Sequence, residues 1–96
     1  MSDFSLEFNG KALKEWKKLD DSIRLQFARK LKERMQAPRV EADRLRGLPD
    51  CYKLKLRSAG YRLVYQVIDQ RLVITVIAVG KRERSAVYGA AEKRLP

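Results

Sequence analysis

Basic side chains recur at every second residue in the stretch 51–57 of this sequence. Lys53, Lys55 and Arg57 are separated by single leucines, so in a β-strand the three cations would share one face. Like charges on one face of a strand repel each other and contribute little to folding. We therefore expect a negatively charged ligand to lie across them.

A second set of cations and a tyrosine could complete a site that cleaves RNA. Lys81, Arg82 and Arg84 follow the last apolar run, and Tyr88 lies just beyond them. Attack of a ribose 2′-hydroxyl on the adjacent phosphate needs a base for the hydroxyl, cations for the developing charge and an acid for the leaving 5′-oxygen. A tyrosine held among several cations has its phenolate favoured and could be the base. The spacing alone is a weak signal, because Lys-x-Lys is common on strands and a tyrosine near a chain end more often packs.

The distribution of charge supports a polyanionic partner. The chain has 22 Lys and Arg against 12 Asp and Glu, a formal net charge of +10. Residues 51–96 carry 10 basic and 3 acidic side chains, whereas residues 1–50 carry 12 and 9. A basic surface on so small a protein is typical of nucleic-acid binding. The alternative is a charge excess that only keeps the protein soluble.

The composition excludes several kinds of site. Histidine is absent, so the usual general base, the commonest metal ligand and Ser-His or Cys-His nucleophiles are missing. The one cysteine, Cys51, cannot form an internal disulfide and is expected to be a small buried hydrophobe. No metal-ligand cluster is present, and we expect no metal and no cofactor. The longest apolar run, residues 72–79, is too short to cross a bilayer, and no signal peptide is found, which predicts a cytoplasmic protein without a membrane partner.

Two periodicities predict the elements in the first half of the chain. Residues 3–8 alternate like a half-buried strand. Asn9 is placed to cap a following helix, and Asp20 and Asp21 start a second helix that ends before Pro38. Apolar residues of the second helix recur at every fourth position: Ile23, Phe27, Leu31 and Met35. The charged residues between them, Arg24 and Arg34 included, are interpreted as a solvated outer face.

In the second half, residues 45–48 are predicted to open a sheet, and residues 51–68 form a hairpin around the turn 58–60. Residues 72–79 predict a strand covered on both faces, and Val87, Ala90, Ala91 and Leu95 give a last helix a weak apolar stripe. We therefore expect one α+β domain over residues 1–96, an antiparallel (mixed) sheet packed on one face by the N-terminal helical hairpin, with a short C-terminal helix. The opposite face, with Lys53, Lys55 and Arg62, is expected to stay open as a basic concave surface.

At these residues the sequence resembles the RelE family of bacterial toxins. The segments LKEWKKL, RLRGLPDCYKLKLRSAGYRLVYQVID and VGKRERSAVY carry the resemblance, in the family's order and separations. The resemblance implies a RelE/ParE-like fold and the toxin of a type II toxin–antitoxin system. It implies a metal-independent endoribonuclease that cuts mRNA in the ribosomal A site, leaving a 2′,3′-cyclic phosphate and a 5′-hydroxyl. Implied partners are a RelB-type antitoxin and the 70S ribosome with its mRNA and rRNA.

The resemblance also implies roles for single side chains. Lys53 and Lys55 would hold and neutralise the scissile phosphate, and Lys55 is also a candidate proton donor or acceptor. Arg62 would stabilise transition-state charge, as would Arg82 near the leaving oxygen, because the very high pKa of an arginine makes it a poor acid. Tyr88 would be the general base or stack on a nucleobase, so Tyr88 and Lys55 remain alternatives for the base. We expect further contacts to RNA or the ribosome from Arg46, Arg57, Lys81 and Arg84.

Two other functions stay open. A ParE-type toxin of the same fold poisons DNA gyrase, and it would not need the lysines, arginines and tyrosine together. A plain RNA-binding module would neither cut mRNA nor damage DNA. An enzyme without a strong acid–base pair should be a poor free ribonuclease, so the RelE-type interpretation implies that the ribosome positions the mRNA.

Overall fold

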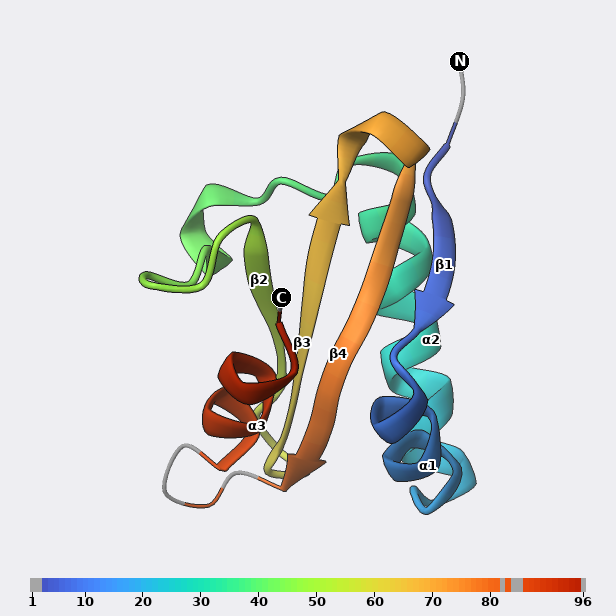
Figure 1. Ribbon diagram of the computed structural model, residues 1–96. Helices are drawn as coiled ribbons and strands as arrows, with labels where there is room; N and C mark the ends of the chain where they lie inside the picture. Colours follow the sequence, from blue (N-terminus) through green and yellow to red (C-terminus); the bar gives the residue numbers. More distant parts are fainter. Residues whose placement is uncertain (1–2, 82, 84–85, 96) are drawn as a thin grey trace.

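The computed structural model describes residues 3–81, 83 and 86–95. A four-stranded sheet has two helices on one face and a third helix on the other (Figure 1). The strands are β1 (Ser5–Phe8), β2 (Cys51–Leu56), β3 (Tyr61–Ile68) and β4 (Val73–Lys81), in the order β1-β4-β3-β2. β1 runs parallel to β4, and the other neighbours are antiparallel. Helices α1 (Gly10–Lys17) and α2 (Asp21–Gln36) cover one face, and α3 (Ala86–Arg94) lies on the other. The expected α+β fold, with its mixed sheet and N-terminal helical hairpin, is confirmed.

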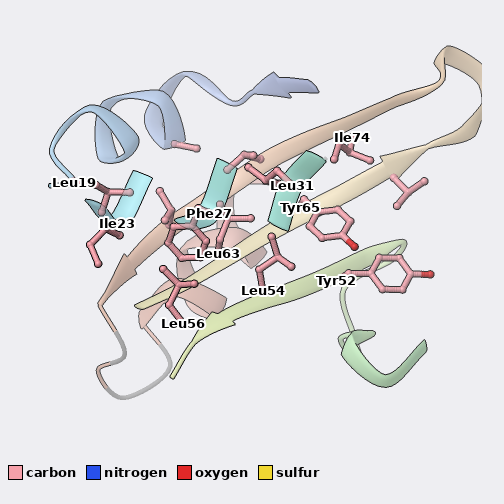
Figure 2. Packing of buried hydrophobic residues seen from close by; sticks show 14 residues of the cluster. Leu19, Ile23, Phe27, Leu31, Tyr52, Leu54, Leu56, Leu63, Tyr65 and Ile74 are labelled. Atoms are coloured by element: carbon pink, nitrogen blue, oxygen red, sulfur yellow. The ribbon is translucent and has the colours of Figure 1, made fainter. Parts of the chain in front are cut away.

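The larger hydrophobic core lies between α2 and the sheet, as Figure 2 shows. Ile23, Phe27 and Leu31 of the predicted stripe are buried. They meet side chains from alternate positions of the strands, among them Leu54 and Leu63. The period of two in the strands and the spacing of four in the helix therefore place apolar side chains on facing surfaces.

The expectation that the other sheet face stays open is wrong for the part of it that α3 covers. Val87 and Ala91 of α3 are buried in a second apolar cluster with Val64 of β3 and Ala78 of β4. The helix comes close because the residues at the contact, Val87, Ala91 and Ala78, are small. Gly80 lies beside this contact, and a Cβ atom there would make an ordinary contact of 3.5 Å with Cγ2 of Val87. The basic face is therefore narrower than the sequence indicates.

Near the strand ends, the structure differs from two of the predicted elements and confirms the burial of Cys51. Leu72 does not open β4, because its φ of 52° is left-handed and its side chain is exposed. Residues 45–48 form no strand, and the bridge to β2 is made by Arg44 with Tyr52 instead. Cys51 is fully buried, as predicted.

Two charged residues of α2 are not part of a solvated face. Arg34 donates hydrogen bonds to the hydroxyl of Tyr65 at 2.8 Å and to Asp43 at 2.6 Å. Arg24 donates to the carbonyl oxygen of Lys17 at 3.1 Å, at the end of α1. Both guanidinium groups therefore tie α2 to neighbouring segments, a role that the helical spacing did not predict.

The N-cap of α1 gives a first testable prediction. The Asn9 side chain accepts hydrogen bonds from the backbone amides of Lys11 and Ala12. Replacing Asn9 with Ala should lower the free energy of unfolding by about 1 kcal/mol, because two helix N–H groups lose their partner. Denaturant titration measures the change. Asp20 stands at the N-cap of α2 but its side chain makes no capping bond, so Asp20→Ala is the matched control and should cost less.

Candidate functional site

The hairpin of β2 and β3 places three of the predicted residues on one face. The register pairs Lys55 with Arg62 and Lys53 with Val64, and directly opposed residues of an antiparallel pair point to the same side of the sheet. The side chains of Lys53, Lys55 and Arg62 are all half-buried. The turn closes at Gly60, whose φ of 71° favours glycine. Three cations therefore lie side by side on the strands, as the alternating sequence predicts.

Helix α3 brings Tyr88 to this cluster. Nη1 of Arg62 donates a hydrogen bond to the Tyr88 hydroxyl at 3.0 Å. The guanidinium carbon lies 5.4 Å from the centroid of the tyrosine ring. The hydroxyl and the ring of Tyr88 are therefore both held against Arg62. Nε of Arg62 is buried and has no hydrogen-bond partner among the described residues.

The crowding of cations changes the acid–base behaviour of Lys55. The positive charge of Lys53 is the largest cause that holds the pKa of Lys55 below its ordinary value, followed by loss of solvent and by the charges of Arg62 and Arg57. Each nearby cation disfavours the protonated amine. Lys55 therefore gives up its proton more readily than an isolated lysine, and a larger fraction of it is neutral at a given pH. The first property suits a proton donor and the second suits a base.

Two open hollows adjoin the Arg62–Tyr88 pair. The first measures about 260 Å³ and is lined by Lys55, Leu56, Arg57, Tyr61 and Arg62. The second measures about 380 Å³, between residues 45–48 and α3, and is lined by Leu45, Arg46, Gly47, Leu48, Tyr88, Gly89 and Glu92. Arg57 thus lines the first hollow and Arg46 the second. Because Arg62 lines one hollow and Tyr88 the other, a bound strand could contact both residues at once.

The remaining predicted site residues, Lys81, Arg82 and Arg84, do not join this cluster in the part of the chain that the structure describes. Lys81 is exposed at the end of β4, and its register opposite Tyr61 points it to the side of the sheet away from Arg62. Arg82 and Arg84 lie outside the described residues. Within residues 3–81, 83 and 86–95, no group of three or more His, Cys, Asp or Glu side chains is placed to hold a metal ion. In the same part of the chain, no helix has the length and apolar character needed to cross a bilayer.

Sequence reasoning missed the residues that hold α3 against the sheet. Arg94 of α3 and Glu15 of α1 form an ion pair with two hydrogen bonds, of 2.8 and 3.0 Å. The partners are 79 residues apart. No local pattern signals such a pair, since each residue looks like an ordinary charge on a helix surface.

Comparisons with known proteins find a family model and relatives that match most of this chain. Residues 6–86 match the family model described as the ParE toxin of the type II toxin–antitoxin system parDE. The mRNA interferase toxin RelE of Escherichia coli K12 is 60% identical over 92 residues, which cover 96% of this chain and 97% of the relative. The structure of a double mutant of E. coli RelE in the free state superposes with a TM-score of 0.90 at 57% identity, covering 100% of both chains. The same mutant toxin bound to a peptide of the antitoxin RelB matches with a TM-score of 0.82 at 56% identity, over 98% of this chain and 99% of that one.

Proposed function

Because this chain belongs to the RelE family of toxins from type II toxin–antitoxin systems, we propose that it cuts the mRNA codon in the A site of the 70S ribosome. Its endoribonuclease activity stops translation, and a RelB-type antitoxin keeps it inactive in the cytoplasm. Relatives more than half identical to it are named mRNA interferases, and one of similar identity was solved with a RelB peptide. These similarities support the mRNA target and the antitoxin.

The observation that carries the proposal is the joint placement of Lys53, Lys55, Arg62 and Tyr88 on one face. Lys53 and Lys55 hold the scissile phosphate, and Arg62 stabilises the charge that develops on it. Tyr88 or Lys55 removes the proton of the 2′-hydroxyl, whose oxygen attacks the phosphorus and gives a 2′,3′-cyclic phosphate. The bond from phosphorus to the 5′-oxygen breaks, and this oxygen takes a proton from the Lys55 ammonium, or from water where Lys55 is the base, to become a hydroxyl; Arg82 is proposed to stabilise its charge.

Each hollow has a place in this proposal. The hollow beside Lys55 and Arg62 receives the scissile phosphate, since cations line it. The hollow beside Tyr88 and Arg46 receives a neighbouring nucleotide, whose base can stack on the tyrosine ring. Arg57, Lys81 and Arg84 are proposed to contact more distant phosphates of mRNA or rRNA, which a basic surface attracts without regard to sequence.

Gyrase poisoning is not favoured, although the matching family model is described as a ParE toxin. The family model matches residues 6–86. The relative that is 60% identical, over 96% of this chain, is named an mRNA interferase. A gyrase poison also has no need for paired lysines next to an arginine–tyrosine hydrogen bond.

Cleavage should depend on the ribosome. On translated mRNA, primer extension should reveal cuts in register with codons, and free RNA of the same sequence should be cut at least about tenfold more slowly, because the site has no strong acid–base pair and relies on orientation. Equal rates on both substrates would contradict the ribosome's role. DNA damage without mRNA cuts would instead indicate a gyrase poison, and neither effect would indicate a binding module.

A further inference from the structure

Glu15 and Arg94 occupy an edge of the sheet that no strand among the described residues covers. β1 pairs with residues 73–76 of β4 and no farther. Beyond that point Oε1 of Glu15 accepts the backbone N–H of Val79 at 3.2 Å, and Nη1 of Arg94 donates to the carbonyl oxygen of Ile77 at 2.9 Å. Buried backbone groups need partners, and here two side chains supply them where a strand would otherwise lie.

The same two side chains bind each other and so join three elements. Nη1 of Arg94 contacts Oε1 of Glu15 at 2.8 Å, and Nη2 contacts Oε2 at 3.0 Å. This bidentate geometry fixes direction as well as distance. The exposed fractions of the two side chains are 14% for Arg94 and 34% for Glu15, so the pair is partly shielded from water. Helix α3 is therefore held to α1 and to β4 at one place.

Apart from this pair, helix α3 is held by the second apolar cluster, against which Tyr88 and Ala90 also pack. It has nine residues, of which Val87 and Ala91 are buried. A helix of this length is not stable by itself in water and depends on tertiary contacts. Tyr88 lies on this helix, one residue after Val87, and its hydroxyl must stay near Arg62 to keep the 3.0 Å hydrogen bond.

We propose that the Glu15–Arg94 ion pair is a positioning device, which fixes α3 on the edge of β4 and thereby sets the Tyr88 hydroxyl against Arg62. Neither residue touches the RNA in this proposal. The inference rests on the proposed function for its catalytic consequence, but the placement of α3 can be tested without activity.

The acid–base state of Glu15 fits this role. Burial by itself would raise the pKa of Glu15, but the hydrogen bonds from Arg94 and from the Val79 amide outweigh burial and leave the pKa below its ordinary value. The carboxylate thus keeps its charge at neutral pH and can hold the arginine.

The test compares Arg94→Gln with Lys93→Gln in the full-length protein. Lys93 is exposed on the same helix. Its replacement also removes one positive charge but leaves the Glu15–Arg94 ion pair intact. Arg94→Gln should raise hydrogen exchange of the amides of residues 87–94 and leave the amides of β2 and β3 unchanged, whereas Lys93→Gln should change neither. Arg94→Lys, which keeps one charged contact to Glu15, should give an intermediate exchange rate.

Cleavage provides the second measurement. Arg94→Gln should slow single-turnover cleavage of ribosome-bound mRNA by roughly 10- to 100-fold, the cost of a displaced catalytic group, with ribosome affinity unchanged. In a Tyr88→Phe background the same substitution should have a much smaller effect, because the hydroxyl is already gone and only the stacking of the ring can still be disturbed. Glu15→Gln, which keeps an acceptor for the Val79 amide, should repeat this pattern if Arg94→Gln folds poorly.

Two results would overturn the inference. One is unchanged exchange in α3 of the Arg94→Gln variant. The other is an equal slowing of cleavage in the wild-type and Tyr88→Phe backgrounds, which would mean that the pair does not act through Tyr88. If the wild-type protein cuts no mRNA, the proposed function fails while faster exchange in α3 still supports the positioning of the helix.

Discussion

Replacing Tyr88 with Phe should slow single-turnover cleavage of A-site mRNA by roughly 10²- to 10⁴-fold, the loss expected when a general base is removed. The ring that faces the Arg62 guanidinium is kept, so stacking on a nucleobase and the contact with arginine are preserved. The hydroxyl alone is lost, and with it the acceptor of the 3.0 Å hydrogen bond. Tyr88→Ala serves as the comparison, because it removes ring and hydroxyl together. A severe Ala variant beside a nearly unaffected Phe variant would mean that Tyr88 only stacks.

The hydrogen bond to Arg62 creates an ambiguity that a double mutant resolves. Loss of the hydroxyl could slow cleavage by freeing Arg62 and not by removing a base. If Tyr88 only holds Arg62, the combination of Tyr88→Phe with Arg62→Ala should be no slower than Arg62→Ala alone. If Tyr88 takes the proton itself, the double mutant should be slower than either single mutant, within the non-additivity common to residues that act together.

A nearly unaffected Phe variant would move the role of base to Lys55. The neighbouring charge of Lys53 holds the pKa of Lys55 below its ordinary value. A lysine that acts as the base works in its neutral form, so the rate should rise as pH increases toward that lowered pKa. A lysine that donates the proton to the leaving oxygen works in its charged form, and the rate should fall above the same pKa. The pH profile of Lys55→Met separates the two, because the limb due to Lys55 disappears.

Replacing Arg62 with Ala should slow the same cleavage step by roughly 10²- to 10³-fold, the usual loss when one preorganised charge stabiliser is removed. Arg62 lies opposite Lys55 in the sheet and donates to Tyr88, so its removal takes away a cation and leaves the tyrosine hydroxyl without this donor. Ribosome affinity should weaken much less, because the other cations of the basic face remain. Single-turnover rates and equilibrium binding to programmed ribosomes measure the two effects separately.

Arg57→Ala is the matched control for Arg62. Arg57 lines the same hollow but is exposed just beyond β2, so its loss should weaken ribosome binding slightly and slow the cleavage step much less than the loss of Arg62 does. Arg62→Lys should recover part of the rate, since a lysine keeps the charge but not the planar fork of donors. Lost ribosome binding with intact cleavage in Arg62→Ala would identify Arg62 as a docking residue and not as a catalytic one.

Much of the fold followed from local patterns. Alternation along residues 51–68 placed Lys53 and Lys55 on one face and the leucines on the other, and Asn9 marked the start of α1. These features depend on the geometry of the strand and the helix themselves, which repeat every two and 3.6 residues whatever the rest of the chain does. The alternation also put Arg62 on the basic face, and Tyr88 stood just beyond a basic run, but no pattern could show that they touch.

The tertiary structure alone decided which surfaces meet. A weak apolar stripe says which side of α3 is buried, but not that this side covers part of the basic face and brings Tyr88 to Arg62 across 26 residues of chain. The pair of Glu15 with Arg94 depends on β1 stopping short along β4, which leaves an edge for two side chains to fill. Such contacts follow from the register and order of strands that are far apart in the chain, and these are set by the packing of the whole molecule and not by any segment of it.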